Sequence, residues 1–223
     1  MILVGILDTE GAEDYSALVD TLSHSEKERF LKIKNEERSK SSLFARLLLK
    51  KLYEEMFSKK LPDVCYSDYG KPFFKEDSCA FSISHDKSIV AVSITDEKDK
   101  IGVDIQSFSL RKERPSKIEK RFLSEIDFCD KKKKIKELEI RFFSLKENNI
   151  KEIDTDSTIF EYENTENESF FERWTQLEAC LKLFGKGFRE LKNVNYYLQK
   201  TLVETMVLKH GGELFALSVA VAK

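Results

Sequence analysis

The sequence is compatible with an α+β fold, because short apolar strand patterns occur in both halves of the chain and each half also contains one long helical pattern. The chain has 223 residues, of which 41% are hydrophobic and 35% are charged, values that are ordinary for a globular protein with a sizeable core. The formal net charge of -2 excludes a general attraction to nucleic acid or to an anionic membrane. Any anion-binding surface must therefore be local.

The first half begins with a strand pattern and continues into a basic helical region. Ile2–Asp8 is an apolar run suited to a buried strand, and Ser25-Glu26-Lys27-Glu28 fits a capping box that opens a helix. Between residues 26 and 60 there are 11 Lys and Arg residues against 6 Glu residues. This local excess of positive charge fits either a solvated helix surface or a wall that binds phosphate groups.

A turn and three strands are expected next. Tyr69-Gly70-Lys71-Pro72 is a turn pattern, and it predicts that Lys71 is held out from the fold at its tip. Strands are expected over residues 80–84, 89–95 and 101–105. Asp104 lies inside the last of them, where a buried carboxylate needs either a polar neighbour or a metal ion as partner.

The second half is predicted to begin with helices over residues 116–123 and 125–143. Residues 152–172 are rich in Asp and Glu and contain no Lys or Arg, which predicts a mobile acidic loop. Strands are expected over 194–198, 202–208 and 214–222, with Gly211-Gly212 joining the last two as a hairpin.

Between these segments lies the run from Trp174 to Phe188, whose helical pattern places Glu178 and Lys182 on one face. Leucine and phenylalanine residues form an adjoining apolar stripe, and Gly185 is suited to end the helix. Taken alone, this spacing is that of an ordinary surface ion pair, which stabilises a helix only slightly.

Four short motifs follow one another in a fixed order along the chain. They are Gly70-Lys71-Pro72, then Phe81-Ser82-Ile83-Ser84-His85, then Gly102-Val103-Asp104-Ile105, then Trp174 with Glu178-Ala179, Lys182 and Gly185-Lys186-Gly187. This ordered set, preceded by a basic helix, resembles the Sfp-type 4′-phosphopantetheinyl transferases. The resemblance implies an α+β fold of two similar α/β halves in a pseudo-twofold (pseudo-dimer) arrangement, with the site in the cleft between them. The expected halves are residues 1–105 and 106–223.

The resemblance also implies an enzyme that transfers the 4′-phosphopantetheine arm of coenzyme A to a serine of an acyl or peptidyl carrier protein, releasing 3′,5′-ADP. Mg²⁺ is the implied cofactor, and hard oxygen ligands suit that ion. Glu178 and Lys182 are the expected catalytic residues. Asp104 and Glu178 are the expected metal ligands, with Gln106 as a further candidate. Coenzyme A is expected to contact Lys71, Ser84, His85, Asp104 and Lys182, with Lys40 and Arg46 of the basic helix as weaker candidates.

The sequence departs from the family pattern at three places. Gln106 stands where many members have a second acidic metal ligand, and Leu177 replaces a lysine before the motif glutamate. The stretch between the Asp104 and Trp174 motifs is longer than usual, so an insertion or a mobile acidic loop is expected within about 130–172. These departures leave open an alternative, a catalytically silent family member that binds coenzyme A or a carrier protein. The carrier protein and its pathway, whether fatty acid, polyketide or nonribosomal peptide biosynthesis, are not indicated by the sequence.

The expected location is cytoplasmic. No apolar run approaches the roughly 20 residues of a membrane-spanning helix, and the N-terminal residues lack the basic lead and cleavage pattern of a signal peptide. The cysteines are widely spaced and are expected to remain reduced. We expect a monomer whose partners are coenzyme A and a carrier protein, with no nucleic acid or membrane partner.

Overall fold

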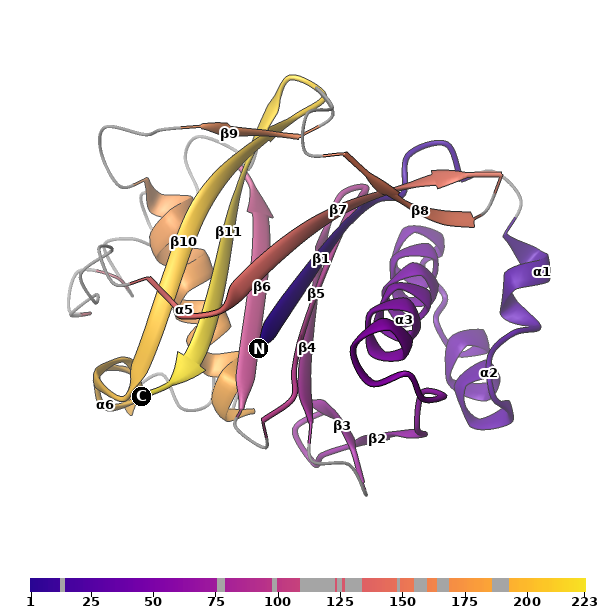
Figure 1. The fold of residues 1–223 in the computed structure, drawn as a ribbon, viewed down its shortest axis with the longest axis horizontal. Helices are drawn as coiled ribbons and strands as arrows, with labels where there is room; N and C mark the ends of the chain where they lie inside the picture. Colours follow the sequence, from indigo (N-terminus) through magenta and orange to yellow (C-terminus); the bar gives the residue numbers. More distant parts are fainter. Residues whose placement is uncertain are drawn as a thin grey trace.

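The computed structural model describes residues 1–12, 15–75, 79–97, 100–108, 123, 126, 134–147, 149–154, 160–163, 169–185 and 193–223. The predicted α+β class is confirmed, because the described residues form three sheets and several helices (Figure 1). The pseudo-twofold relation between two halves stays a prediction.

The first sheet has the strand order β4-β5-β1-β7-β8 and the second sheet has the order β6-β11-β10-β9. The first sheet consists of β1 (Ile2–Asp8), β4 (Ala80–Asp86), β5 (Ile89–Thr95), β7 (Leu138–Lys146) and β8 (Asn149–Ile153). The second sheet consists of β6 (Ile101–Ser107), β9 (Glu161–Glu163), β10 (Thr201–His210) and β11 (Glu213–Ala222). A small third sheet pairs β2 (Val64–Tyr66) with β3 (Pro72–Phe74).

The helices cover the outer faces of the two main sheets. Their bounds are α1 (Ser16–Val19), α2 (His24–Leu31), α3 (Glu36–Phe57), α5 (Phe170–Phe184) and α6 (Val194–Gln199). Helix α3 packs on the first sheet and α5 packs on the second, on opposite sides of the molecule (Figure 1). The order of layers is therefore helix, sheet, sheet, helix.

Alternation along the strands explains this layering. In β1, Leu3 and Leu7 point into the core shared with α3, whereas Val4 and Ile6 point into the core between the sheets. Strand β5 is buried along its whole length in the same way. A strand that is buried on both faces needs apolar residues at successive positions, and this is why both segments read as continuous apolar runs.

Several sequence-based expectations are confirmed. Strands β1 and β5 have the predicted bounds, β4 and β6 each extend two residues further, and β10 and β11 form the predicted hairpin across Gly211-Gly212. Cys65, Cys79 and Cys180 carry thiols rather than disulfides. Among the described helices, none is long and apolar enough to cross a membrane.

Two predicted secondary structures are wrong. Residues 138–143, expected to end a helix, lie in strand β7, which pairs parallel with β1 and places Phe142 and Phe143 in the cores on its two sides. The remainder of the two helices predicted over 116–143 lies largely outside the described residues. Residues 194–198, expected as a strand, lie in helix α6, because Val194 and Leu198 are both buried at a helical spacing while Tyr196 between them is exposed.

The capping box that opens the basic region lies two residues earlier than predicted. Ser23, rather than Ser25, caps α2, and its backbone N–H donates to the Glu26 carboxylate over 3.0 Å. The basic region is then interrupted at residues 32–35, where Asn35 caps the start of α3 by accepting a hydrogen bond from the backbone of Arg38. Two helices therefore replace the single expected one.

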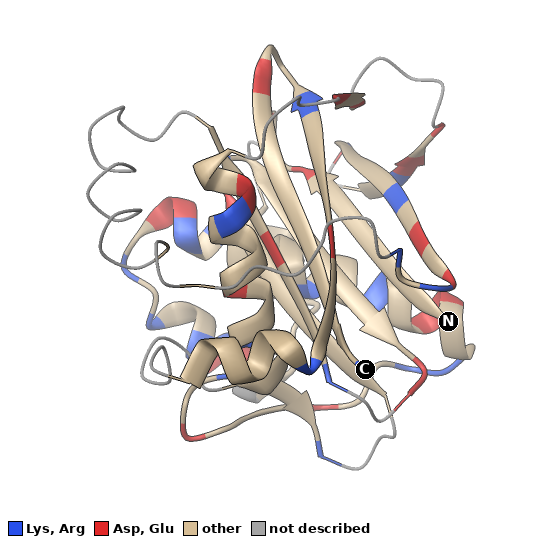
Figure 2. Cartoon of the chain, turned by 90° about the vertical axis from the view of Figure 1, so that its left-hand side faces the viewer, with Lys and Arg blue, Asp and Glu red and all other residues tan. Residues whose placement is uncertain are grey.

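The sheets exchange strands across the boundary expected near residue 105. Strand β6 belongs to the second sheet, and β7 and β8, from the stretch expected to be an insertion or acidic loop, belong to the first. The division into halves at 105/106 stays a prediction about folding units. Figure 2 shows acidic and basic residues interspersed over the described chain, in keeping with the small net charge.

Candidate active site

Helix α5 carries the two charged residues that the sequence singled out. Ser169 caps its start in a capping box with Glu172, and Gly185 ends it in the left-handed conformation, with φ of 66°. Beneath the helix, the buried hydroxyl of Thr175 lies 2.8 Å from that of Ser218 on β11. These contacts fix the rotation of α5 over the second sheet.

Strand β6 presents Asp104 toward this helix. Alternation along β6 turns Val103 and Ile105 into the core between the sheets and turns Gly102, Asp104 and Gln106 to the other face. At Gly102 the strand touches the helix backbone, because a Cβ atom there would lie 1.9 Å from the Ala179 carbonyl oxygen. The close approach brings Asp104 within reach of side chains on α5.

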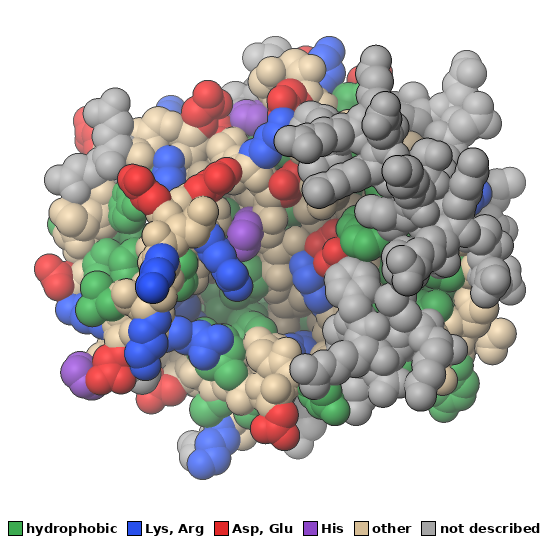
Figure 3. Space-filling model, turned by 180° about the vertical axis from the view of Figure 1, so that it is seen from behind, with side chains coloured by type: hydrophobic (Ala, Val, Ile, Leu, Met, Phe, Trp, Pro, Cys, Tyr) green, Lys and Arg blue, Asp and Glu red, His purple; other side chains and the backbone are tan. Residues whose placement is uncertain are grey.

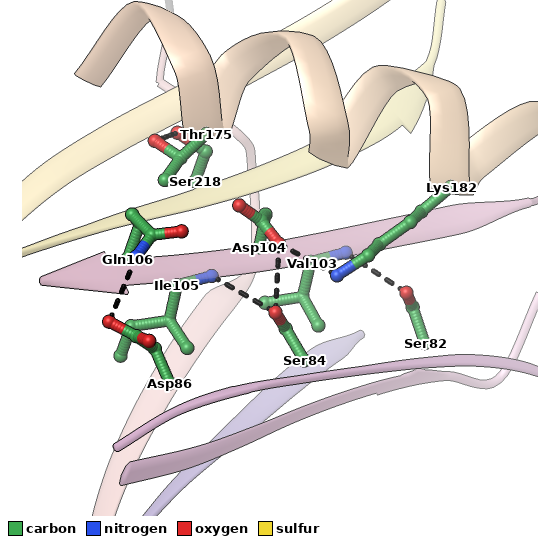
Figure 4. A network of polar contacts seen from close by, with 10 residues as sticks. All are labelled: Ser82, Ser84, Asp86, Val103, Asp104, Ile105, Gln106, Thr175, Lys182 and Ser218. Carbon is green, nitrogen blue, oxygen red and sulfur yellow. Dashed lines mark hydrogen bonds and ion pairs between the residues drawn. The ribbon is translucent and has the colours of Figure 1, made fainter. Parts of the chain in front are cut away.

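The edge strands β4 and β6, from different sheets, are joined through side chains. The Ser82 hydroxyl accepts a hydrogen bond from the Val103 N–H over 3.1 Å, and the Ser84 hydroxyl accepts one from the Ile105 N–H over 3.3 Å (Figure 4). The two sheets therefore meet along a line of polar contacts that forms the floor of the site.

Asp104 is the buried centre of these contacts. Lys182 Nζ donates to its Oδ1 over 2.7 Å, and the Ser84 hydroxyl donates to the same oxygen over 2.8 Å (Figure 4). The Asp104 side chain is only 5% exposed. Burial raises the pKa of Asp104, while Lys182 and Ser84 act in the opposite direction.

Glu178 lies one helical turn before Lys182 and is close enough to Asp104 for the two carboxyl groups to interact. Burial, followed by the charge of Asp104, raises the pKa of Glu178 to about 7, although Lys182 and a hydrogen bond from Trp174 counteract the increase. The sequence placed Glu178 and Lys182 beside each other as an i,i+4 pair. In the structure Lys182 instead makes its short ion pair with Asp104 on the neighbouring strand.

A pocket of about 300 Å³ opens beside these residues. Glu178 and Lys182 line one side, while Gly70, Pro72 and Phe81 line the other. A second, larger hollow of about 830 Å³ adjoins it and shares Gly70, Pro72, Phe81 and Ile83 with it. The two hollows therefore lie side by side, separated by these shared residues.

The larger hollow, which we call the basic groove, runs over α2, the start of α3 and β4. Figure 3 shows Lys and Arg side chains around a hollow on this face. The cationic residues of the basic groove are Arg29, Lys32, Lys34, Arg38 and Arg46, with His85 on the β4 side. Desolvation, followed by the charges of Lys182 and Arg38, lowers the pKa of His85. His85 thus lies between the cations of the groove and those of the pocket.

The two weaker candidates from the basic helix differ in position. Arg46 lines the basic groove, but it forms an ion pair with Glu26 and donates to the Pro62 carbonyl over 3.4 Å. Lys40 is not among the described residues that line the groove. The basic region predicted from the sequence includes four further residues of the groove, but no motif distinguishes them from the other cations of that region. They are Arg29, Lys32, Lys34 and Arg38.

Lys71 is not held out from the fold as the turn pattern predicted. Its Nζ donates to the Leu183 carbonyl at the end of α5 over 2.8 Å, and its aliphatic chain lies against Gly185. The last carbonyl groups of a helix lack partners within the helix, and a lysine at this end also meets a favourable dipole. Burial and the nearby Lys100 lower the pKa of Lys71 to about 8.

Gln106 lies near the site, but its amide nitrogen is engaged. Nε2 donates to Asp86 Oδ2 over 3.0 Å, and the Ser107 N–H donates to the same oxygen over 2.6 Å. The side chain of Asp86, at the end of β4, was not predicted to take part in the site. Its place two residues after Ser84, on the same face of the strand, is the pattern that could have revealed it.

Comparison with known proteins points to the same family as the four sequence motifs. The family model described as "4′-phosphopantetheinyl transferase, N-terminal" matches residues 10–97. The chain is also 23% identical over 211 residues to the 4′-phosphopantetheinyl transferase gsp of Aneurinibacillus migulanus, covering 94% of this chain and 75% of that protein. The chain is therefore similar to the 4′-phosphopantetheinyl transferase family. The resemblance predicted from the four motifs is thereby confirmed.

The donor set of this site fits a divalent cation. Asp104 and Glu178 are two carboxyl groups, on facing elements, whose pKa values are both raised by burial and by proximity to further negative charge. Such a site gains stability from a bound cation, and carboxylate oxygens are ligands that Mg²⁺ prefers. The amide oxygen of Gln106 lies on the side of Asp104 (Figure 4).

Proposed function

We propose that this protein is an active member of the 4′-phosphopantetheinyl transferase family, and that it transfers the phosphopantetheine arm of coenzyme A to a serine hydroxyl of an acyl or peptidyl carrier protein. The observation that carries the proposal is that the basic groove lies beside the Glu178–Lys182 pocket and shares four lining residues with it. Coenzyme A has a phosphorylated nucleotide at one end and a diphosphate before its pantetheine arm. A groove of cations beside a pocket with an acid and a lysine suits both parts.

The cations of the basic groove are suited to hold the nucleotide end. Lys32, Lys34 and Arg38 surround the N-terminus of α3, where backbone N–H groups and the helix dipole also favour an anion. His85, between this region and Lys182, is placed to contact a phosphate group from the floor of the groove. Because Lys71 donates to the Leu183 carbonyl, we assign it first to holding the turn on α5 and only secondarily to the nucleotide.

The reaction forms a bond between the serine oxygen and the phosphorus that carries the pantetheine arm, and breaks the bond from that phosphorus to the ADP oxygen. Glu178 is the candidate to accept the serine proton, and its pKa of about 7 is that of the metal-free protein. Lys182 is placed to stabilise negative charge that develops on the leaving phosphate. Asp104 and Glu178 would hold Mg²⁺, with Gln106 as a further oxygen ligand, and a bound Mg²⁺ would neutralise the diphosphate.

The test is mass spectrometry of apo carrier proteins incubated with the protein, coenzyme A and Mg²⁺. A mass increase equal to one phosphopantetheine arm on the carrier serine is expected, together with release of 3′,5′-ADP. Absence of the adduct on fatty-acid, polyketide and peptide-synthetase carriers, with coenzyme A still bound, would favour the silent binding alternative instead.

Variants of the site test the assigned roles. Glu178→Gln and Asp104→Ala are expected to lower transfer by a factor of 100 or more, because each removes a group needed for charge or proton handling. Glu163→Gln, an exposed acid on β9, is the matched control and should retain activity. Wild-type rates for Glu178→Gln or Asp104→Ala, after metal removal and Mg²⁺ addition, would refute the assignment.

The proposed contact of His85 with the 3′-phosphate of coenzyme A can be tested with dephospho-coenzyme A, which lacks that phosphate. His85→Ala should raise KM for coenzyme A, whereas the KM for dephospho-coenzyme A should be the same in variant and wild type. An equal effect on both cofactors would show that His85 does not contact the 3′-phosphate.

A further inference from the structure

The contact between Asp86 and Gln106 stands at the edge of the proposed metal site. Asp86 Oδ2 accepts two hydrogen bonds, one from the Gln106 side-chain amide at 3.0 Å and one from the Ser107 backbone at 2.6 Å. It thereby continues the line begun by Ser82 and Ser84, whose hydroxyls accept from the N–H groups of Val103 and Ile105. Alternate side chains of β4 thus meet alternate N–H groups of β6 (Figure 4).

This contact determines which end of the Gln106 amide faces the site. A carboxylate accepts hydrogen bonds and donates none, so only the amide nitrogen of Gln106 can face Asp86. The amide oxygen is then turned to the opposite side, and Figure 4 shows it on the side of Asp104. The oxygen and NH₂ ends of the amide are nearly equivalent in shape, so without Asp86 either end could face the site. An NH₂ group turned toward the site would repel a cation.

We propose that Asp86 is a positioning residue for the metal site: it holds Gln106 with its carbonyl oxygen directed toward Asp104, where it serves as an oxygen ligand. The inference rests on the proposed function insofar as that function places a divalent cation between Asp104 and Glu178. The positioning role of Asp86 also accounts for an amide, rather than a carboxylate, at position 106. A glutamate there would bring a second carboxylate to the distance at which Gln106 now donates to Asp86, and like charges at that distance repel.

The experiment uses Mn²⁺ alone as the probe and measures its dissociation constant from the electron paramagnetic resonance signal of the free ion. Asp86→Ala removes the acceptor and is expected to weaken Mn²⁺ binding about tenfold, as loss of a group that orients a metal ligand commonly does. Asp86→Asn removes the charge, but its side-chain oxygen can accept both hydrogen bonds. Its dissociation constant is expected to stay within about twofold of the wild-type value.

A double variant separates positioning from simple destabilisation. In a Gln106→Ala background, Asp86→Ala should change Mn²⁺ affinity by less than about twofold, because the side chain through which Asp86 acts is gone. The same loss in both backgrounds would overturn the proposal. Equal weakening by Asp86→Asn and Asp86→Ala would also overturn it, since that result would mean that Asp86 acts by its charge or as a ligand itself.

Failure of the proposed function gives a different result. If wild-type protein binds no Mn²⁺, both the metal site and this inference are wrong. If Mn²⁺ binds and depends on Asp86 through Gln106 while no carrier protein is modified, the positioning role stands and the transferase activity does not.

Discussion

At the scale of single residues, Glu178 shows a conflict between function and stability. Its carboxyl group is held beside the Asp104 carboxyl in a largely buried position, and the pKa near 7 expresses how unfavourable its ionised form is there. A glutamate with an ordinary pKa would be ionised at neutral pH without cost, but it would be a weaker acceptor for a serine proton. The raised pKa suits the chemistry and weakens the metal-free fold.

The effect on stability has a definite sign. The unfolded chain ionises Glu178 near its ordinary pKa of 4.5, and the folded chain does so only near 7. Below 4.5 both states are protonated and the group contributes nothing. As the pH rises toward 7 the folded state loses stability relative to the unfolded state, and above 7 the loss is constant. Replacing the group by a neutral one should therefore stabilise the protein only at the higher pH.

We predict that Glu178→Gln, in metal-free buffer, has a free energy of unfolding about 2 kcal/mol higher than wild type at pH 8, with most of the gain lost at pH 5. Urea titrations at the two pH values measure this difference. Glu163→Gln, at an exposed position, should show no such dependence. A gain for Glu178→Gln that is the same at both pH values would contradict the assigned cause.

At the scale of elements, the position of α5 over β6 decides whether Glu178, Lys182 and Asp104 meet. Gly102 is the contact point, since only the absence of a side chain allows the helix backbone to lie against the strand. Gly102 belongs to a motif, so its position was visible in the sequence. Its packing role could not be predicted, because a glycine in a strand equally indicates a bulge or an approaching ligand.

We predict that Gly102→Ala destabilises the fold by about 3 kcal/mol or more and lowers transfer at least tenfold, because the Cβ atom would meet the fixed Ala179 carbonyl and push α5 away. Gly5→Ala on β1 is a matched control. Its Cβ would meet only the ends of the Leu52, Leu48 and Phe143 side chains, 2.9 to 3.2 Å away, and these can shift. Gly5→Ala should cost less stability and leave the dependence of transfer on Mg²⁺ unchanged. Equal losses of activity in the two variants would contradict this account.

At the scale of the whole molecule, the sequence predicted the features that depend on residues close together in the chain. The buried strands β1 and β5 are mostly apolar, so their bounds could be read from residue types, and Gly185 marked the end of α5. The start of α5 at Phe170 lies inside the stretch that was predicted to be an acidic loop. Asp104, Glu178 and Lys182, which come from two of the motifs, lie close together in the structure. The contacts of Lys71 with α5 and of Asp86 with Gln106 join segments far apart in the chain, and no local pattern specifies such contacts.

The helix prediction for residues 138–143 failed for the same reason. With two adjacent phenylalanines and many charges, β7 has neither clean alternation nor a helical stripe, and it becomes a strand because β1 offers it a parallel edge. Its place between β1 and β8 makes it an interior strand of the first sheet. We therefore expect this part of the lengthened 130–172 stretch to be required for folding.

Phe143 provides the test, because its ring is fully buried in the core between the first sheet and α3. Phe143→Ala is predicted to lower the free energy of unfolding by about 3–5 kcal/mol, the usual cost of removing a buried ring. Tyr162 on β9, whose side chain is 62% exposed, is the control within the same stretch, and Tyr162→Ala should change stability by less than about 0.5 kcal/mol. Chemical denaturation of the three proteins gives both values. A small loss for Phe143→Ala would mean that β7 is an appendage on the sheet, whereas the predicted loss would make β7 a structural part of the first sheet.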